Sequence, residues 1–449
     1  MKKHNNYILG LIALIFVSIV FKYDLLSSIG IGIFVFWIVS LVNASNEYLP
    51  IMELLFCLFS LQFLFGPALS YNGFDEYTIE SYRMKINSES YFTFIIPLFI
   101  IFPMGFSVFF KPNIFKPNNK NLNTWLKFNP NIPYVFIVIG FISPFLIDYI
   151  PSSLSVIGYL LESFKFIGIF ILILSNQKIK PFLLSGIYVG ILISSFIGGM
   201  FHDLLIWIIV LGLILSIRYK PSLGMKIIAI FVFAIFASFI QSLKGGLREA
   251  TWGSNEKVSI DLIENINKEN ISENTGFFTM KNLGPQVNRI NQGWILASSI
   301  DHVPANESHT YGKLTTQYIY SALMPRILAP TKLRSGDQEV FNKYSGHYLT
   351  DATSMGLGLF TDAYIEFGQY GAIIYILLWG IMYGFVLKKF LFYSEKYPIL
   401  ILFSILAFVY PMRPDCDTQT VLGHLFKTIM LLAVIFTFFK KSFLLPTKI

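Results

Sequence analysis

The chain has 449 residues, of which 54% are hydrophobic and only 13% charged, whereas roughly a quarter of a typical soluble domain is charged. This composition excludes a soluble enzyme, a disordered chain, a collagen-like protein and a disulfide scaffold. Its apolar residues come in long blocks, so most segments have no polar face to present to water. We therefore predict an all-α, polytopic integral membrane helix bundle, long enough for about twelve transmembrane helices of ~20 residues each.

In chain order, the apolar blocks predict transmembrane helices over residues 7–22, 25–42, 49–69, 91–110, 132–148, 152–175, 181–199, 201–217, 226–242, 362–387, 398–411 and 421–439. The first block has no small-residue cleavage site, so we expect an uncleaved span and not a secretory signal. Cys57 and Cys416 lie far apart in segments of different polarity, which argues against a structural disulfide.

The distribution of Lys and Arg predicts the orientation, because positive charge beside a span is retained in the cytoplasm. With the N-terminus inside, the cytoplasmic loops and termini collect 17 Lys or Arg, and the short external loops collect 4. We expect both termini to be cytoplasmic. The same asymmetry explains the net charge of +8, so no nucleic-acid partner is implied.

One segment, residues 243–361, is too long to be a simple connector. It divides the chain into a first transmembrane part (1–242), a large extracytoplasmic loop (243–361) and a second transmembrane part (362–449). Within the loop, residues 286–299 and 315–328 show apolar residues at helical spacing, which predicts interfacial helices or helices packed on the bundle. No internal repeat is found, which argues against a two-halved transporter.

Motifs for several common chemistries are missing. The six histidines show no H-x-x-x-H spacing and the cysteines are not paired, so we expect no metal and no other cofactor. The chain also has no P-loop and no G-x-G-x-x-G motif. Any chemistry is therefore expected outside, without nucleotide hydrolysis.

Arginine is the functional group that the predicted external face offers. Guanidinium groups suit bidentate binding of phosphate, and cations at a membrane interface suggest a lipid-linked phosphate. In the loop, Arg326, Lys332 and Arg334 fall within nine residues beside Pro325 and Pro330; three like charges so close favour a bound anion. The candidate pyrophosphate- and glycan-binding residues are Arg248, Arg289, Arg326, Lys332, Arg334 and Arg413.

Glycosyl transfer needs a base within hydrogen-bonding distance of the acceptor hydroxyl. The candidates are Asp337, His347, Glu366 and Asp351, the last also being a plausible helix N-cap.

Two pairs of ionisable residues lie inside predicted spans. Glu162 and Lys165 share a helix face, where we expect a structural ion pair. His424 and Lys427 are one turn apart and could point into an external cavity beside Arg413.

These features together resemble the bacterial oligosaccharide repeat-unit polymerases, the Wzy-type O-antigen and capsule polymerases. The resemblance is carried by about a dozen spans with one late external loop, by the segment Pro325-Arg326-x-x-x-Pro330-x-Lys332, and by the stretch from Ser354-x-x-x-Gly358 to the aromatic and glycine-rich residues 364–371. The resemblance in topology extends over nearly the whole chain, whereas the resemblance in motifs is confined to residues 289–380.

The resemblance implies a metal-independent membrane glycosyltransferase in the bacterial cytoplasmic (inner) membrane. It would polymerise undecaprenyl-pyrophosphate-linked repeat units into surface polysaccharide, such as lipopolysaccharide O-antigen or capsule, by inverting transfer at the outer leaflet. Arginines would stabilise the pyrophosphate leaving group. The implied partners are lipid-linked oligosaccharides and membrane lipids, with a chain-length regulator and a flippase of the same pathway.

The sequence also departs from the related families. No external arginine is followed by glycine eleven positions later, a pattern of some polymerases, whereas His347 and Gly358 have the histidine-to-glycine spacing of the O-antigen ligases. Aligned on Gly368, however, the ligase histidine position is Leu357. A ligase, a transporter or flippase for lipid-linked oligosaccharide, and a structural or signalling membrane protein remain alternatives to the polymerase.

Overall fold

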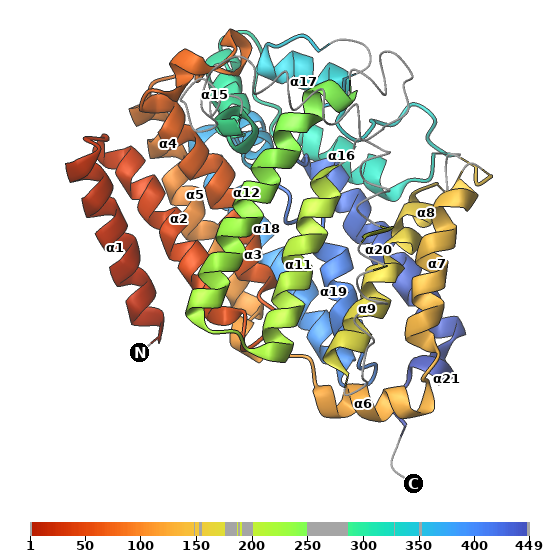
Figure 1. Cartoon of the computed structure of the whole chain (residues 1–449). Coiled ribbons are helices and arrows are strands. Elements are labelled where there is room, and N and C mark those ends of the chain that lie inside the picture. The colour runs from red at the N-terminus through yellow and green to blue at the C-terminus, as the bar shows by residue number, and fades with distance from the viewer. Residues whose placement is uncertain are drawn as a thin grey trace.

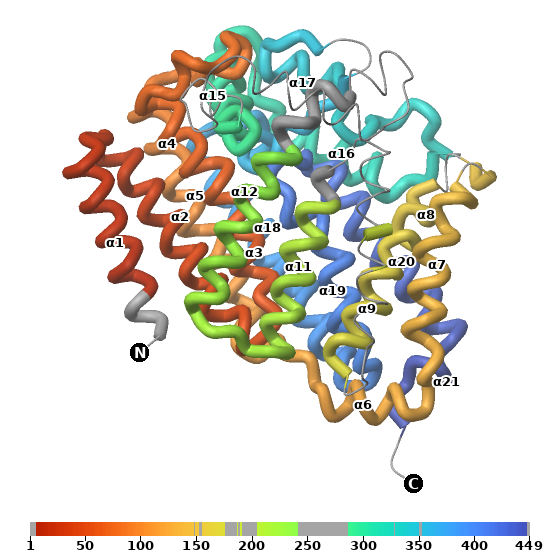
Figure 2. Tube along the Cα trace, viewed as in Figure 1, coloured from red at the N-terminus to blue at the C-terminus, as the bar shows by residue number. Residues whose placement is uncertain are grey.

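The computed structural model describes residues 2–147, 149–151, 155–175, 186, 189–190, 201–248, 286–326, 328–349 and 353–446. Within these ranges every regular element is a helix, which confirms the all-α prediction (Figure 1). The start of α1 and the short helix α21 lie at one end of the molecule, and α15, α16 and α17 lie at the other (Figures 1 and 2).

The helices before the predicted loop are α1 (Lys2–Val20), α2 (Leu25–Ala44), α3 (Ile51–Ser60), α4 (Gly66–Tyr71), α5 (Ser88–Phe109), α6 (Asn119–Phe128), α7 (Ile132–Ile147), α8 (Ser155–Glu162), α9 (Phe164–Leu174), α11 (Phe201–Tyr219) and α12 (Leu223–Arg248). A π-helical turn, η1 (Leu61–Phe65), joins α3 to α4, and short 3₁₀ turns are η2 (Phe74–Tyr77), η3 (Glu80–Tyr82) and η4 (Pro112–Ile114). The later helices are α15 (Gly293–His302), α16 (Lys313–Leu323), α17 (Gln338–Ser345), α18 (Leu359–Ser394), α19 (Leu400–Phe408), α20 (Thr418–Phe438) and α21 (Lys440–Phe443).

Seven helical segments of the described chain are long and apolar enough to cross a membrane. The number is eight if the segment Pro112–Phe128 and helix α7, which meet at a bend of 84°, together form one span. This supports a polytopic membrane protein but does not establish twelve spans. The apolar parts of α1 and α11 are shorter, and α19 has nine residues, a rise of only about 14 Å. The predicted span 181–199 lies almost wholly outside the described residues. Twelve spans therefore stay a prediction.

The outer surface of the bundle is apolar. Of the segment Leu223–Ile240 in α12, only 6% is buried, and Phe231 on this helix and Ile19 on α1 are 69% and 71% exposed. Exposed apolar area of this extent is unfavourable in water and is what a lipid-facing helix requires.

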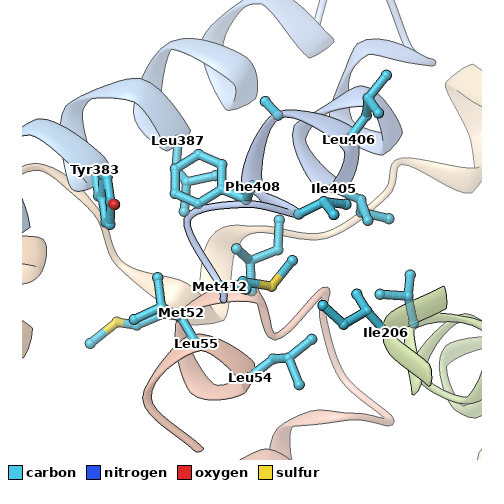
Figure 3. Packing of buried hydrophobic residues seen from close by; sticks show 14 of the residues in the cluster. Met52, Leu54, Leu55, Ile206, Tyr383, Leu387, Ile405, Leu406, Phe408 and Met412 are labelled. Carbon is cyan, nitrogen blue, oxygen red and sulfur yellow. The ribbon is translucent and has the colours of Figure 1, made fainter. Parts of the chain in front are cut away.

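Helices α5 and α18 pack against each other along the bundle, and glycines allow their backbones to approach. A Cβ atom at Gly380 would lie 2.4 Å from the carbonyl oxygen of Phe102, and one at Gly384 would lie 2.3 Å from that of Phe106. Small residues four apart are a common solution for close helix packing in membranes, where the hydrophobic effect gives no drive for association. Figure 3 shows part of the surrounding apolar core, where side chains of α3, α11, α18 and α19 meet.

Helices α15, α16 and α17 pack together on this bundle. Trp294 of α15, Tyr318 of α16 and Phe341 of α17 are almost fully buried and belong to one apolar cluster. The helices expected within 286–299 and 315–328 are therefore present as α15 and α16, with shifted ends. Their buried faces hold them at fixed positions over the bundle.

Candidate functional site

A cavity of about 660 Å³ lies where the end of α16 and the segment after it meet the bundle. Its described lining comes from α8, α9 and α11, from the end of α16 and the segment after it, and from α19 and α20. Cavities of this size are typical of small-molecule sites. We therefore take it as the candidate site.

Four cations line this cavity: Arg326, Lys332, Lys427 and Lys165, the last of which is paired with Glu162. Burial, reinforced by the charges of Lys427 and Arg326, lowers the pKa of Lys332 from its ordinary value. No described residue hydrogen-bonds or ion-pairs with the side chains of Arg326 or Lys427. Because like charges repel at this proximity, the arrangement favours a bound anion.

Lys332 has a second role in the fold. Its Nζ donates to the carbonyl oxygen of Ser321 at 2.7 Å and also to that of Met324, at the C-terminal end of α16. A cation is stabilised there because the last carbonyls of a helix carry partial negative charge. Lys332 thus fixes the end of α16 from which Arg326 follows.

Glu162 is the one carboxylate among the described lining residues. It pairs with the buried Lys165 at 2.8 Å, which confirms the expected ion pair. The pair spans the break between α8 and α9, and the Lys165 ammonium also lies over the rings of Phe141 and Phe166. A negative group paired in this way leaves the cavity positive overall.

His424 and Lys427 both line the cavity, as the sequence suggested, whereas Arg413, expected beside them, is not among the lining residues. The ring of His424 stacks on Tyr410 with 4.3 Å between centroids, and Nε2 lies 2.7 Å from the carbonyl oxygen of Leu406. Since a carbonyl only accepts, Nε2 carries the proton. The imidazole is therefore oriented by its neighbours before any ligand enters.

The other predicted binding residues do not line the cavity in the described chain. Arg289 and Arg334 are exposed. Arg413 pairs with Asp415 at 3.0 Å and lies over the ring of Tyr410. Arg248 ends α12, and its side chain lies outside the described residues. Of the six candidates, the structure brings Arg326 and Lys332 together.

The predicted bases also lie away from the cavity. Asp337 caps α17 by accepting from the Val340 amide, and His347 Nε2 lies 2.9 Å from Ser298 Oγ, with its ring edge-on to Trp294. Burial, with smaller effects of Lys85 and His302, lowers the pKa of His347 below its ordinary value of 6.5. Asp351 lies outside the described residues.

Glu366 is fully buried in α18, where its carboxylate binds the start of α16. It accepts from Thr310 Oγ1 at 2.5 Å, from the Gly312 amide at 2.6 Å and from the Thr315 amide. Carboxylates are favoured at a helix N-terminus, where unpaired amides carry partial positive charge. Glu366 and Lys332 therefore hold the two ends of α16.

Sequence reasoning missed the polar wall at the first turn of α20. Asp417 caps this helix, and Gln419 and Thr420 line the cavity together with Ser335. The available signal was a run of polar residues, 417–420, at the entry to an apolar span. Capping explains Asp417 but not the buried Gln419.

Comparison with known proteins places the chain in a family without assigning an activity. Residues 104–445 match a family described as a domain of unknown function, DUF8712. No curated protein and no solved structure matches the chain. The match spans most of the chain, including every helix that lines the cavity, and the protein therefore belongs to the DUF8712 family.

Proposed function

We propose that this protein is a metal-independent membrane glycosyltransferase that polymerises undecaprenyl-pyrophosphate-linked oligosaccharide repeat units into surface polysaccharide. The observation that carries the proposal is the set of cations in the cavity, of which Arg326 and Lys427 lack partners in the described chain. Cations preorganised in a partly water-excluded site stabilise a phosphate leaving group, a task that a metal ion performs elsewhere.

The rest of the lining suits the lipid part of such a substrate. Apolar side chains continue from the cations into the bundle, namely Leu160, Leu204, Trp207, Phe426 and Met430. A site that is cationic in one part and apolar in another fits an anionic head group on a hydrocarbon chain.

Glu162 is the base that this geometry favours. In the proposed step its carboxylate takes the proton of the acceptor hydroxyl, the acceptor oxygen bonds to the anomeric carbon, and the bond from that carbon to the pyrophosphate oxygen breaks. Undecaprenyl pyrophosphate leaves with the bonding electrons, held by Arg326 and Lys427. Lys165 orients the carboxylate at 2.8 Å. Asp337, His347 and Glu366 then serve the fold, not the reaction.

The proposed topology has twelve spans, both termini in the cytoplasm and the cavity near the outer leaflet of the bacterial inner membrane. It is supported by the 17-to-4 distribution of Lys and Arg and by the position of the start of α1 and of α21 toward the end opposite α15–α17 (Figure 1). Single cysteines placed at residues 120 and 317 should label from the cytoplasmic and external side, respectively. Labelling of both from one side would refute this topology.

One observation favours a second candidate, a transporter of lipid-linked oligosaccharide. Glu162, Lys165 and Lys427 come from different helices of the bundle and all line the same cavity, and ionisable residues within spans often mark a transport path. The polymerase is preferred because the cations Arg326 and Lys332 belong to the external segment.

The deciding experiment is deletion of the gene in its host, with rescue by the wild type or by Arg326→Ala. The lipid-linked and surface glycans of each strain are run on a gel. We expect single repeat units at the surface of the deletion strain and no ladder with Arg326→Ala, a loss of more than about tenfold from one charge-assisted contact. Repeat units retained on the cytoplasmic leaflet would show a transporter, and polymerised glycan retained on the carrier would show a ligase.

A further inference from the structure

The cavity reaches the surface of the bundle through apolar side chains. Five of its lining residues are apolar or aromatic and 37% to 55% exposed, and they form its rim: Ile157 and Tyr159 of α8, Leu323 and Met324 at the end of α16, and Met430 of α20. The other exposed lining residues of the described chain are Pro325 and Ser335. Helices α8 and α16 each contact α20. The rim therefore marks an opening where these helices meet.

The opening extends far along α20. Met430 lies past the middle of the 21-residue segment Thr418–Phe438, which is long and apolar enough to cross a membrane. Thr420, in the first turn of the same helix, also lines the cavity, and the two residues are about 15 Å apart along the helix axis. That length is half of a hydrocarbon core of ~30 Å. An exposed apolar side chain past the middle of a span faces lipid chains and not water.

The free cations of the cavity lie closer to the start of α20 than the deep end of the rim does. Lys427 is one turn before Met430 on the same side of α20, and its Nζ would lie 3.9 Å from a Cβ atom at Gly423, one turn closer still to the start of the helix. A lysine within a span commonly turns its ammonium toward the membrane interface in this way. An anionic head group held by Lys427 and Arg326 would thus have its hydrocarbon chain beside Met430.

We propose that the cavity takes its lipid-linked substrate sideways from the outer leaflet through the rim. The inference rests on the proposed function and deepens it. The cations bind the pyrophosphate, the rim contacts the part of the polyprenyl chain next to the pyrophosphate, and the rest of the chain stays in the bilayer. Because contact with the rim removes apolar area of the chain and of the rim from other surroundings, the chain adds to the affinity. The site is therefore selective for lipid-linked over inorganic pyrophosphate.

The test measures binding of two ligands to the full-length protein in nanodiscs. One is undecaprenyl pyrophosphate, supplied in the bilayer, and the other is inorganic pyrophosphate, supplied in solution. The main variant is Leu323→Trp, which narrows the rim with a larger apolar side chain. The matched control is Ile319→Trp, one turn earlier on α16, where the native side chain is 44% exposed, against 45% for Leu323, but does not line the cavity.

We expect the wild type to bind undecaprenyl pyrophosphate more tightly than inorganic pyrophosphate. Leu323→Trp should weaken binding of undecaprenyl pyrophosphate about tenfold, the effect of excluding about two methylene groups from an apolar site, and leave binding of inorganic pyrophosphate unchanged. Ile319→Trp should change neither. Equal weakening of both ligands by Leu323→Trp would overturn the inference, because the substitution would then act on the cations and not on the path of the chain.

A second pair of variants on α20 keeps the test decisive if a substitution in α16 disturbs the fold. Met430→Trp narrows the deep end of the rim, and Ile429→Trp places the same side chain at an exposed neighbour that does not line the cavity. The same contrast between variant and control is expected, and undecaprenyl pyrophosphate binding that survives narrowing of the rim would overturn the inference. Equal affinity of the wild type for both ligands would also overturn it, whereas failure of the wild type to bind either ligand would overturn the proposed function.

Discussion

Glu366→Ala separates an anchoring role of this buried carboxylate from a catalytic one. The carboxylate pairs two backbone amides, those of Gly312 and Thr315, and the hydroxyl of Thr310. The hydroxyl can rotate toward another acceptor, but the amides cannot. Each buried amide left unpaired costs about 1–3 kcal/mol, so the substitution should destabilise the fold by about 2–6 kcal/mol, the start of α16 being most affected.

Two assays are combined. The first heats the detergent-solubilised protein and measures, by size-exclusion chromatography, how much monodisperse protein remains at each temperature; the second is the polymer ladder of the host strain. We expect Glu366→Ala to lower the melting temperature clearly. Glu339→Ala, which removes an exposed carboxylate from α17, should leave the melting temperature unchanged. A Glu366→Ala protein that melts like the wild type but makes no polymer would refute the anchoring role and restore Glu366 as a candidate base.

The remaining predictions concern the base, the core and pH. Glu162→Gln should abolish polymer formation while binding of undecaprenyl pyrophosphate persists, and a retained ladder would exclude Glu162 as base. Gly380→Leu should abolish folding because its Cβ would meet the Phe102 carbonyl oxygen at 2.4 Å. Gly212→Leu, whose Cβ has no atom of the described residues within 4 Å, should fold; equal yields of the two variants would contradict the packing. Because the pKa of His347 is lower in the folded protein than in the unfolded chain, the unfolded chain takes up the proton first as the pH falls, and the folded state loses stability below about pH 6.5. His347→Gln should therefore flatten the decline in melting temperature from pH 7.5 to 5.5. An unchanged slope would contradict this.

Helix capping illustrates how far local sequence reaches in this protein. Asp337 and Asp417 each precede a helix and accept from an amide inside it, and both caps depend only on residues within three positions. The ion pair of Glu162 and Lys165 is equally local. Such contacts are readable from spacing because the helix itself sets the distance.

Composition and apolar periodicity by themselves determined the class of this protein, an all-helical chain with apolar membrane segments and further helices within residues 243–361. Only the tertiary structure decided which charged residues share a site. Arg326 and Arg334 are near neighbours in sequence, yet Arg326 lines the cavity and Arg334 is exposed, while Lys427 comes from a helix about a hundred positions away. The physical reason is that helix spacing fixes contacts within a turn, whereas the position of a helix over the bundle depends on anchors from distant segments, such as Glu366 at the start of α16.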